Sequence, residues 1–311
     1  MAKDKILTID IGASKVRIQS INRQYNILQE NLASTVSANF NNEKFIEFLI
    51  GKIKLITENR KEHQSAISIG APGLVEPEKG IIGTMPNIWG VKNLPIAKIL
   101  GETFNLPVFL INDADAACIG EWQLGSGRGY KNMVYLTLGT GVGSSVVLNG
   151  ELKQASELGC TFLTAGSEDR ICRCGKINCA ESFLGTSGLA ETYAEVFNIQ
   201  KSGLSPEEIS SLSFKMREGV KAKDPGWLKV QEKYCDYLNL FLENVLKAYN
   251  PEVIILGGGI AFNNQSLLKT VTKKIKSKKE TVVLLAQFEN SVNIGAAKYA
   301  FDKLKSLHTQ A

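Results

Sequence analysis

The chain has 311 residues, 44% of them hydrophobic and 22% charged, which is typical of a globular protein long enough for two domains. Its formal net charge of +5 is local, because one short stretch holds Lys269, Lys273, Lys274, Lys276, Lys278 and Lys279. We interpret that stretch as the solvated face of a helix, not as a nucleic-acid patch. The amino-terminal residues do not resemble a signal peptide and no stretch reaches membrane-spanning length, so we expect a cytoplasmic protein that binds neither membrane nor nucleic acid.

The chain opens with a predicted hairpin, in which the strands 5–10 and 16–21 flank a turn of small residues. Such a turn leaves backbone N–H groups able to face an anion, so Gly12, Ser14 and Lys15 are candidate phosphate-binding residues. Asp10, at the end of the first strand, is a candidate acceptor for magnesium-bound water. Most turns of this composition are merely turns, so the pattern is weak by itself.

The next elements alternate between helix and strand. Apolar residues at helical spacing predict a helix over 42–60 with Asn41 or Asn42 as its cap, and 66–70 is a predicted buried strand. We expect irregular loops over 71–81 and 84–90, the second of which carries Asn87. A short helix over 95–104 and a strand over 107–112 follow.

Asp113 stands directly after that strand and before a helical stretch that ends near Gly125. Open α/β sheets usually place their chemistry at such a strand end. The alternative is that Asp113 only caps the helix, and position alone does not decide between the two.

Residues 133–148 repeat the pattern of the first hairpin, again with a glycine turn between two strands. The likeness of LTLGTGVG to LTIDIGAS suggests an internal duplication, with two phosphate-facing hairpins that imply a cleft. Gly139 and Gly141 permit close backbone approach to a phosphate, and Thr140 offers a hydroxyl. Neither a Walker A motif nor GxGxxG is present.

Four of the six cysteines lie between Glu157 and Glu181. Gly175 allows the backbone to fold back so that Cys160, Cys172, Cys174 and Cys179 converge, which predicts a structural, tetrahedral zinc site. Arg170, Arg173 and Lys176 are expected to favour the thiolates. The alternative is four unligated thiols, because the spacing is near CxxC but does not match it.

The last third is predicted to hold a helix near 187–197, a polar segment over 201–226 without clear periodicity, and a long helix over 227–249. A buried strand over 253–260 runs into Gly257, Gly258 and Gly259, where a flat ring could lie against the backbone. A strand over 281–286 and a helix over 295–307 close the chain.

Taken together, the motifs resemble the ROK family of bacterial sugar kinases and repressors. DIGASK, GAPGLVEP, the PN of TMPNIWG, NDADAACIGEW, LGTGVGS, the cysteine cluster ending CAE, and NPEVIILGGGI occur in the family's order, between about residue 5 and residue 300. The resemblance implies an α/β chain with the two-domain, actin-like ATPase (ribonuclease H-like) fold and a deep interdomain cleft. The expected domains are 1–118, with the helix 295–311 packed back on it, and 119–294, which carries the zinc cluster.

The resemblance also implies roles for individual residues. Asp113 would be the general base for a sugar 6-hydroxyl that attacks the γ-phosphate of ATP, and Asp10 would organise the water shell of Mg²⁺. The sugar-binding residues would be Gly73, Asn87, Asn112, Glu157 and Glu181. Gly257, Gly258 and Gly259 would flank the adenine and ribose, and a homodimer or higher homo-oligomer is expected.

Three departures from the family pattern bear on activity. Ala13 and Ser14 replace Gly and Thr in the first hairpin, and Asp115 replaces an amide near Asp113, where it could raise the pKa of that carboxyl. Cys160 replaces a histidine that ligates zinc and contacts the sugar, and a thiolate supplies no second nitrogen for that contact.

We therefore predict a glucokinase-like ATP-dependent hexose kinase. The alternatives are an N-acetylmannosamine or N-acetylglucosamine kinase and a catalytically weak, sugar-sensing ROK regulator. A DNA-binding repressor is disfavoured because the family's repressors carry a helix-turn-helix before the first hairpin, which here begins at residue 5.

Overall fold

The computed structural model describes residues 4–35, 40–57, 64–85, 88, 90–153, 156–163, 169–274 and 281–310. The chain divides into two compact units, one formed by Met1–Leu124 with Asn290–Ala311 and the other by Gly125–Glu289. The boundaries expected from the sequence were after residues 118 and 294. None of the described helices is long and apolar enough to cross a membrane.

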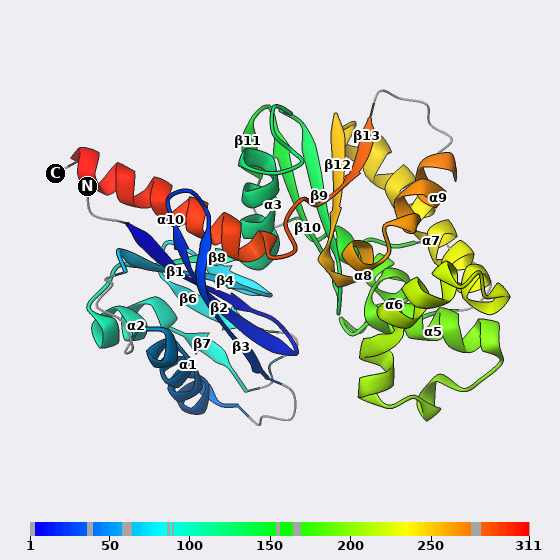
Figure 1. Cartoon of the computed structure of the whole chain (residues 1–311), viewed down its shortest axis with the longest axis horizontal. Helices are drawn as coiled ribbons and strands as arrows, with labels where there is room; N and C mark the ends of the chain where they lie inside the picture. Colours follow the sequence, from blue (N-terminus) through cyan, green and yellow to red (C-terminus); the bar gives the residue numbers. More distant parts are fainter. Residues whose placement is uncertain are drawn as a thin grey trace. The chain divides into compact units, whose positions relative to one another are not determined.

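The first unit is built on a five-stranded sheet of order β3-β2-β1-β4-β8 (Figure 1). Strands β3, β2 and β1 pair antiparallel, whereas β1, β4 and β8 run parallel. The elements of this unit are β1 (Lys5–Ile11), β2 (Lys15–Asn22), β3 (Ile27–Ser34), α1 (Asn42–Thr57), β4 (Ala66–Ala71), β5 (Leu74–Glu76), β6 (Ile81–Thr84), β7 (Lys92–Leu94), α2 (Ile96–Phe104), β8 (Val108–Asn112), α3 (Asp113–Gln123) and α10 (Ser291–Gln310).

Helices cover both faces of this sheet. Leu7 and Ile9 of β1 join a buried cluster with Phe45 of α1, so α1 lies on the face to which the odd-numbered residues of β1 point. Thr8 points to the other face, where its hydroxyl accepts a hydrogen bond from Asn293 of α10 at 3.0 Å. Because both faces are covered, β1 and β4 are almost wholly buried, although β1 contains the polar residues Lys5, Thr8 and Asp10.

The loop expected over 71–81 is in part regular, which corrects the prediction. Strands β5, β6 and β7 form a small antiparallel sheet of their own. Pro72 and Pro77 lie just outside the three residues of β5, so neither proline removes a hydrogen-bond donor from the strand.

The second unit repeats the plan of the first with a sheet of order β11-β10-β9-β12-β13, again antiparallel in its first three strands and parallel in the rest. The duplication suggested by the sequence is therefore confirmed at the level of topology. The elements of this unit are β9 (Met133–Leu138), β10 (Val142–Leu148), β11 (Glu151–Lys153), η1 (Leu158–Cys160), α4 (Ala180–Leu184), α5 (Thr186–Phe197), η2 (Lys201–Gly203), α6 (Pro206–Lys221), α7 (Pro225–Tyr249), β12 (Val253–Gly257), α8 (Gly258–Asn263), α9 (Ser266–Lys274) and β13 (Val282–Leu285).

Two predictions for the second unit were wrong. The polar segment over 201–226 contains α6, which starts at a capping box formed by Ser205 and Glu208, so side-chain capping defines a helix that hydrophobic periodicity did not reveal. The strand predicted over 253–260 ends at Gly257, and Gly258 starts α8 with a φ of +81°. The interpretation of the lysine run agrees with α9 as far as the run is described, because Leu267 and Val271 are buried in the core cluster of the unit, whereas Lys276, Lys278 and Lys279 lie outside the described residues.

Candidate active site and cysteine cluster

The carboxyl ends of three parallel strands bring the candidate acidic residues of the first unit together. Asp10 of β1 pairs with Gly70 of β4, and Gly70 pairs in turn with Ile111 of β8, two residues before Asp113. A methyl group on Gly70 would lie 3.7 Å from the Cα of Asp113. Asp10 and Asp113 therefore belong to neighbouring positions at one edge of the sheet.

The electrostatics of Asp10 agree with this placement. The pKa of Asp10 is raised to about 7, chiefly by burial and then by the negative charge of Asp113, against smaller opposing effects of Arg17 and Lys15. A hard divalent cation such as Mg²⁺ binds oxygen ligands and offsets the repulsion between two neighbouring carboxylates. The residues present thus fit the metal that the family resemblance implies.

Asn112 and Gly73 lie beside Asp113. The Oδ1 of Asn112 accepts hydrogen bonds from the backbone N–H groups of Ala114 and Asp115 at 2.9 and 3.2 Å, so Asn112, and not Asp113, is the N-cap of α3. Its Nδ2 donates to the carbonyl of Gly73 at 3.4 Å. The cap leaves Asp113 as the first residue of the helix, where the helix dipole favours a negative charge.

The remaining expectations for this unit concern three other positions. Asn87 lies outside the described residues. Asp115 is buried, with 5% of its surface exposed. In the first hairpin, Ala13 and Ser14 form the turn between β1 and β2, and the N–H of Gly12 donates to the carbonyl of Lys15 at 2.9 Å.

In the second unit, the hairpin turn between β9 and β10 is joined to Glu181. The Oε2 of Glu181 accepts a hydrogen bond from the backbone N–H of Val142 at 3.0 Å, and a methyl group on Gly141 would lie 2.3 Å from the same oxygen. A side chain at Gly141 would therefore displace the Glu181 carboxylate from its hydrogen bond with Val142. Phosphate approach was the only role expected for this glycine from the sequence.

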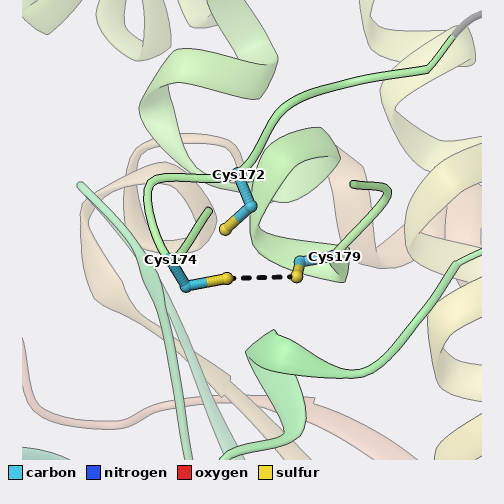
Figure 2. Close-up of side chains that lie close together, drawn as sticks. All are labelled: Cys172, Cys174 and Cys179. Carbon is cyan, nitrogen blue, oxygen red and sulfur yellow. Dashed lines mark hydrogen bonds between the residues drawn. The ribbon is translucent and has the colours of Figure 1, made fainter. Parts of the chain in front are cut away.

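Three cysteine sulfurs converge next to Glu181. The Sγ atoms of Cys172, Cys174 and Cys179 all lie within 4.8 Å of one another, and those of Cys174 and Cys179 are 3.5 Å apart (Figure 2). Gly175 forms the expected turn, with a φ of +84° and its N–H donating to the carbonyl of Cys172 at 3.0 Å. Tetrahedral zinc with Zn–S bonds of about 2.3 Å separates its sulfurs by about 3.8 Å, so this group fits three of its ligands.

Cys160 does not join that group, which corrects the prediction of four converging thiols. It ends the single turn η1, where its side chain is exposed. The pKa of the Cys160 thiol is raised to about 11, first by burial and then by the negative charges of Glu157, Cys174 and Glu181. These three groups therefore lie near Cys160. Glu157 is also exposed and directly precedes η1.

Arg170 does not assist the thiols, contrary to expectation. Its guanidinium is buried, donates to Glu195 at 2.7 Å and to the carbonyl of Gly188 at 3.3 Å, and stacks over the rings of Phe183 and Tyr237. Arg170 therefore anchors the start of the cysteine loop to α5 and α7. The sequence offered no signal for this role beyond one arginine among polar residues.

The pKa values of the clustered thiols follow their surroundings. Burial raises the pKa of Cys179 to about 12 and raises that of Cys172, whereas the backbone N–H of Lys176 lowers the pKa of Cys174. Zinc binding displaces these protons, so metal affinity rises with pH.

A pocket of about 300 Å³ in the second unit connects these features. Its lining includes Thr140 of the hairpin turn together with Cys172 and Glu181. One predicted phosphate-binding residue, Thr140, and one predicted sugar-binding residue, Glu181, therefore line the same pocket. The Gly257–Gly259 run adjoins β9, since a methyl group on Gly258 would lie 2.5 Å from the carbonyl of Leu138, while Gly259 has open space in place of a side chain.

A sequence profile described as the ROK family matches residues 6–302. The chain belongs to the ROK family. A glucokinase of Halalkalibacterium halodurans is 34% identical over 221 residues, which cover 68% of this chain and 66% of that protein. A xylose repressor of Caldicellulosiruptor bescii is 26% identical over 92% of this chain and 72% of its own length.

The fold is also that of the family's solved structures. A ROK family glucokinase from Streptomyces griseus, solved in complex with glucose and AMPPNP, superimposes with a TM-score of 0.81 at 22% identity and covers 95% of this chain and 98% of its own. The chain thus has the actin-like ATPase fold that the sequence predicted. Its relatives include both sugar kinases and repressors, so the family alone does not assign the activity.

Proposed function

We propose that this protein is an ATP-dependent hexose kinase that phosphorylates the 6-hydroxyl of its sugar. The observation that carries the proposal is the pair Asp10 and Asp113 at one sheet edge, where Asp113 contributes to the raised pKa of Asp10. A ROK regulator that only senses sugar has no need of two carboxylates that destabilise each other. A kinase needs both, one for the cation and one for the proton.

In the proposed reaction, Asp113 accepts the proton of the 6-hydroxyl while that oxygen forms a bond to the γ-phosphorus of ATP. The bond between the γ-phosphorus and the β,γ-bridging oxygen breaks, and ADP leaves with the bond electrons. Asp10 would hold Mg²⁺ through its water shell, and the ion would neutralise phosphate charge. The turns with Gly12, Ser14 and Lys15 and with Gly139, Thr140 and Gly141 would bind the phosphates.

The residues proposed to bind the sugar are Gly73, Asn87, Asn112, Glu157 and Glu181. Gly257, Gly258 and Gly259 would lie against the nucleoside. Structural zinc would be held by Cys172, Cys174 and Cys179, whose sulfurs the structure brings together.

Phosphoryl transfer from ATP should be measured across a panel of hexoses and N-acetylhexosamines. We expect turnover with a hexose, and Asp113→Asn should lower kcat by about 100-fold or more while sugar binding is retained. The exposed Glu102 provides the matched control, Glu102→Gln, which should behave as wild type. Preference for an N-acetylhexosamine would reassign the substrate. Sugar binding without turnover on any acceptor would instead identify a sensing regulator.

A further inference from the structure

The turn between β9 and β10 is held in place by a residue that no sequence motif singled out. The carbonyl oxygen of Gly139 accepts two hydrogen bonds from Thr186, one from its backbone N–H at 2.9 Å and one from its hydroxyl at 2.8 Å. Two donors from a single residue fix both the position and the direction of that carbonyl. Thr186 therefore constrains the turn where the chain leaves β9.

Thr186 is itself rigidly placed. It is the first residue of α5, where the backbone N–H has no partner within the helix and Gly139 supplies one instead. The preceding residue, Gly185, packs so closely that a methyl group there would lie 3.0 Å from the carbonyl oxygen of Thr140. The start of α5 therefore packs directly against the turn between β9 and β10.

Within this turn, some backbone N–H groups already have a hydrogen-bond acceptor and others do not. The N–H of Gly139 donates to the carbonyl of Gly141 at 3.0 Å, and the N–H of Val142 donates to Glu181. The N–H groups of Thr140 and Gly141 between them have no hydrogen-bond partner among the described residues. Two successive unoccupied amides form the kind of concavity that binds a phosphate oxygen.

In the first unit a threonine also bonds the hairpin turn, but through different carbonyls instead of one. Thr35, just after β3, donates from its backbone N–H to the carbonyl of Ser14 at 3.0 Å and from its hydroxyl to the carbonyl of Ala13 at 3.0 Å. The side chain of Thr35 is buried, with 6% exposed. Each turn of the duplicated scaffold is therefore tied by the N–H and hydroxyl of one threonine outside the hairpin.

We propose that Thr186, with Thr35 as its counterpart, is a positioning residue that keeps a hairpin turn preorganised for the phosphates of the nucleotide. The proposal rests on the proposed kinase function, because it assigns these turns to ATP. Neither hydroxyl contacts ATP in this scheme. Each acts through the turn carbonyl that it holds, so its loss weakens nucleotide binding and leaves sugar binding unchanged.

The test compares Thr186→Val, which removes the hydroxyl and keeps the shape, with Thr186→Ser, which keeps the hydroxyl. Calorimetric titration with ATP and Mg²⁺ gives Kd without requiring turnover, and steady-state kinetics gives KM for ATP and for sugar. Losing one hydrogen bond should raise Kd and KM for ATP about three- to tenfold in Thr186→Val. Thr186→Ser should stay within about twofold of wild type.

The control is Thr103→Val, at an exposed threonine of α2 whose hydroxyl donates only to its own helix at Ile99. It should leave both constants unchanged. An unchanged Kd for ATP in Thr186→Val would overturn the proposal, and so would an equal rise in the KM values for ATP and sugar, which would indicate general distortion. The same experiment with Thr35→Val should weaken ATP binding to a similar degree.

The two proposals can fail separately. Wild-type protein that binds ATP but phosphorylates no acceptor would refute the kinase function, while the effect of Thr186→Val on the Kd for ATP would still decide the role of Thr186. Wild-type protein that does not bind ATP would refute both.

Discussion

Asp10 provides a direct test of the electrostatics of the proposed active site. Its pKa is raised from 3.8 to about 7 in the folded protein, chiefly by burial and then by Asp113. At 1.36 kcal/mol per pKa unit, ionised Asp10 costs up to about 4 kcal/mol of folding stability when no cation is bound. Asp10→Asn removes this charge with little change in shape and should therefore stabilise the protein.

The pH dependence has a definite sign. Below about pH 4 the carboxyl is protonated in the folded and unfolded states, and the variant has no advantage. As pH rises from about 4 to 7, the unfolded state of the wild type ionises first, so wild-type stability falls and the advantage of Asp10→Asn grows. Above about pH 7 both states are ionised and the difference is constant.

Thermal unfolding of both proteins between pH 4 and pH 9, without divalent cations, measures the difference. At pH 8 we expect the Tm of Asp10→Asn to exceed that of the wild type by about 3 °C or more, with no difference at pH 4. Millimolar Mg²⁺ should raise the Tm of the wild type and not that of the variant. Glu102→Gln, on the exposed face of α2, controls for the loss of one negative charge. Parallel Tm curves for wild type and Asp10→Asn across this range would refute the reasoning.

Three further predictions concern the second unit. Gly141→Ala should lower stability by about 1–3 kcal/mol, because its methyl group meets the Glu181 carboxylate, whereas Gly139→Ala has open space and should have little effect on the Tm. Arg170→Ala should cost about 1–3 kcal/mol in denaturant unfolding, since it removes the bond to Glu195, which keeps its pairing with Lys233, and the stacking over Phe183 and Tyr237; no measurable loss would show that the anchor is unimportant. Metal analysis should find about one zinc per chain, and Cys172→Ser should lower zinc affinity more than Cys160→Ser; equal losses would place both thiols equally in the site.

Local sequence patterns predicted the framework because each pattern has a local cause. The duplication was visible in two similar hairpin sequences, and the two sheets have the same strand order. Residue type predicted a helix cap at Asn41 or Asn42, and the side chain of Asn41 accepts from the N–H of Lys44 at 2.8 Å. The position of Asp113 after a buried strand indicated chemistry, and the structure makes Asn112 the N-cap, while the Oδ1 of Asp113 also accepts from the N–H of Ala114 at 2.8 Å.

The parts that were missed depend on contacts between distant segments. Nothing local to Gly141 reveals that Glu181, 40 positions later, fills the space beside it. The same holds for Thr186 and Gly139, and for Arg170, whose partners lie on two later helices. The proposed fourth zinc ligand failed for a related reason. Spacing places Cys160 near the other thiols, but the orientation of η1 determines where its side chain points.

Because the two units share a strand order, the lengths of their matching connections can be compared. In the first unit the connection from β3 to β4 runs from Ser34 to Ala66 and holds α1. The matching connection in the second unit, from β11 to β12, runs from Lys153 to Val253 and holds the cysteine loop and α4 to α7. The second unit thus carries a much longer connection at this place than the first, while the strand order of the two sheets is the same. Differences in acceptor preference among related chains should therefore accumulate in that connection, where insertions leave the strand pairing intact.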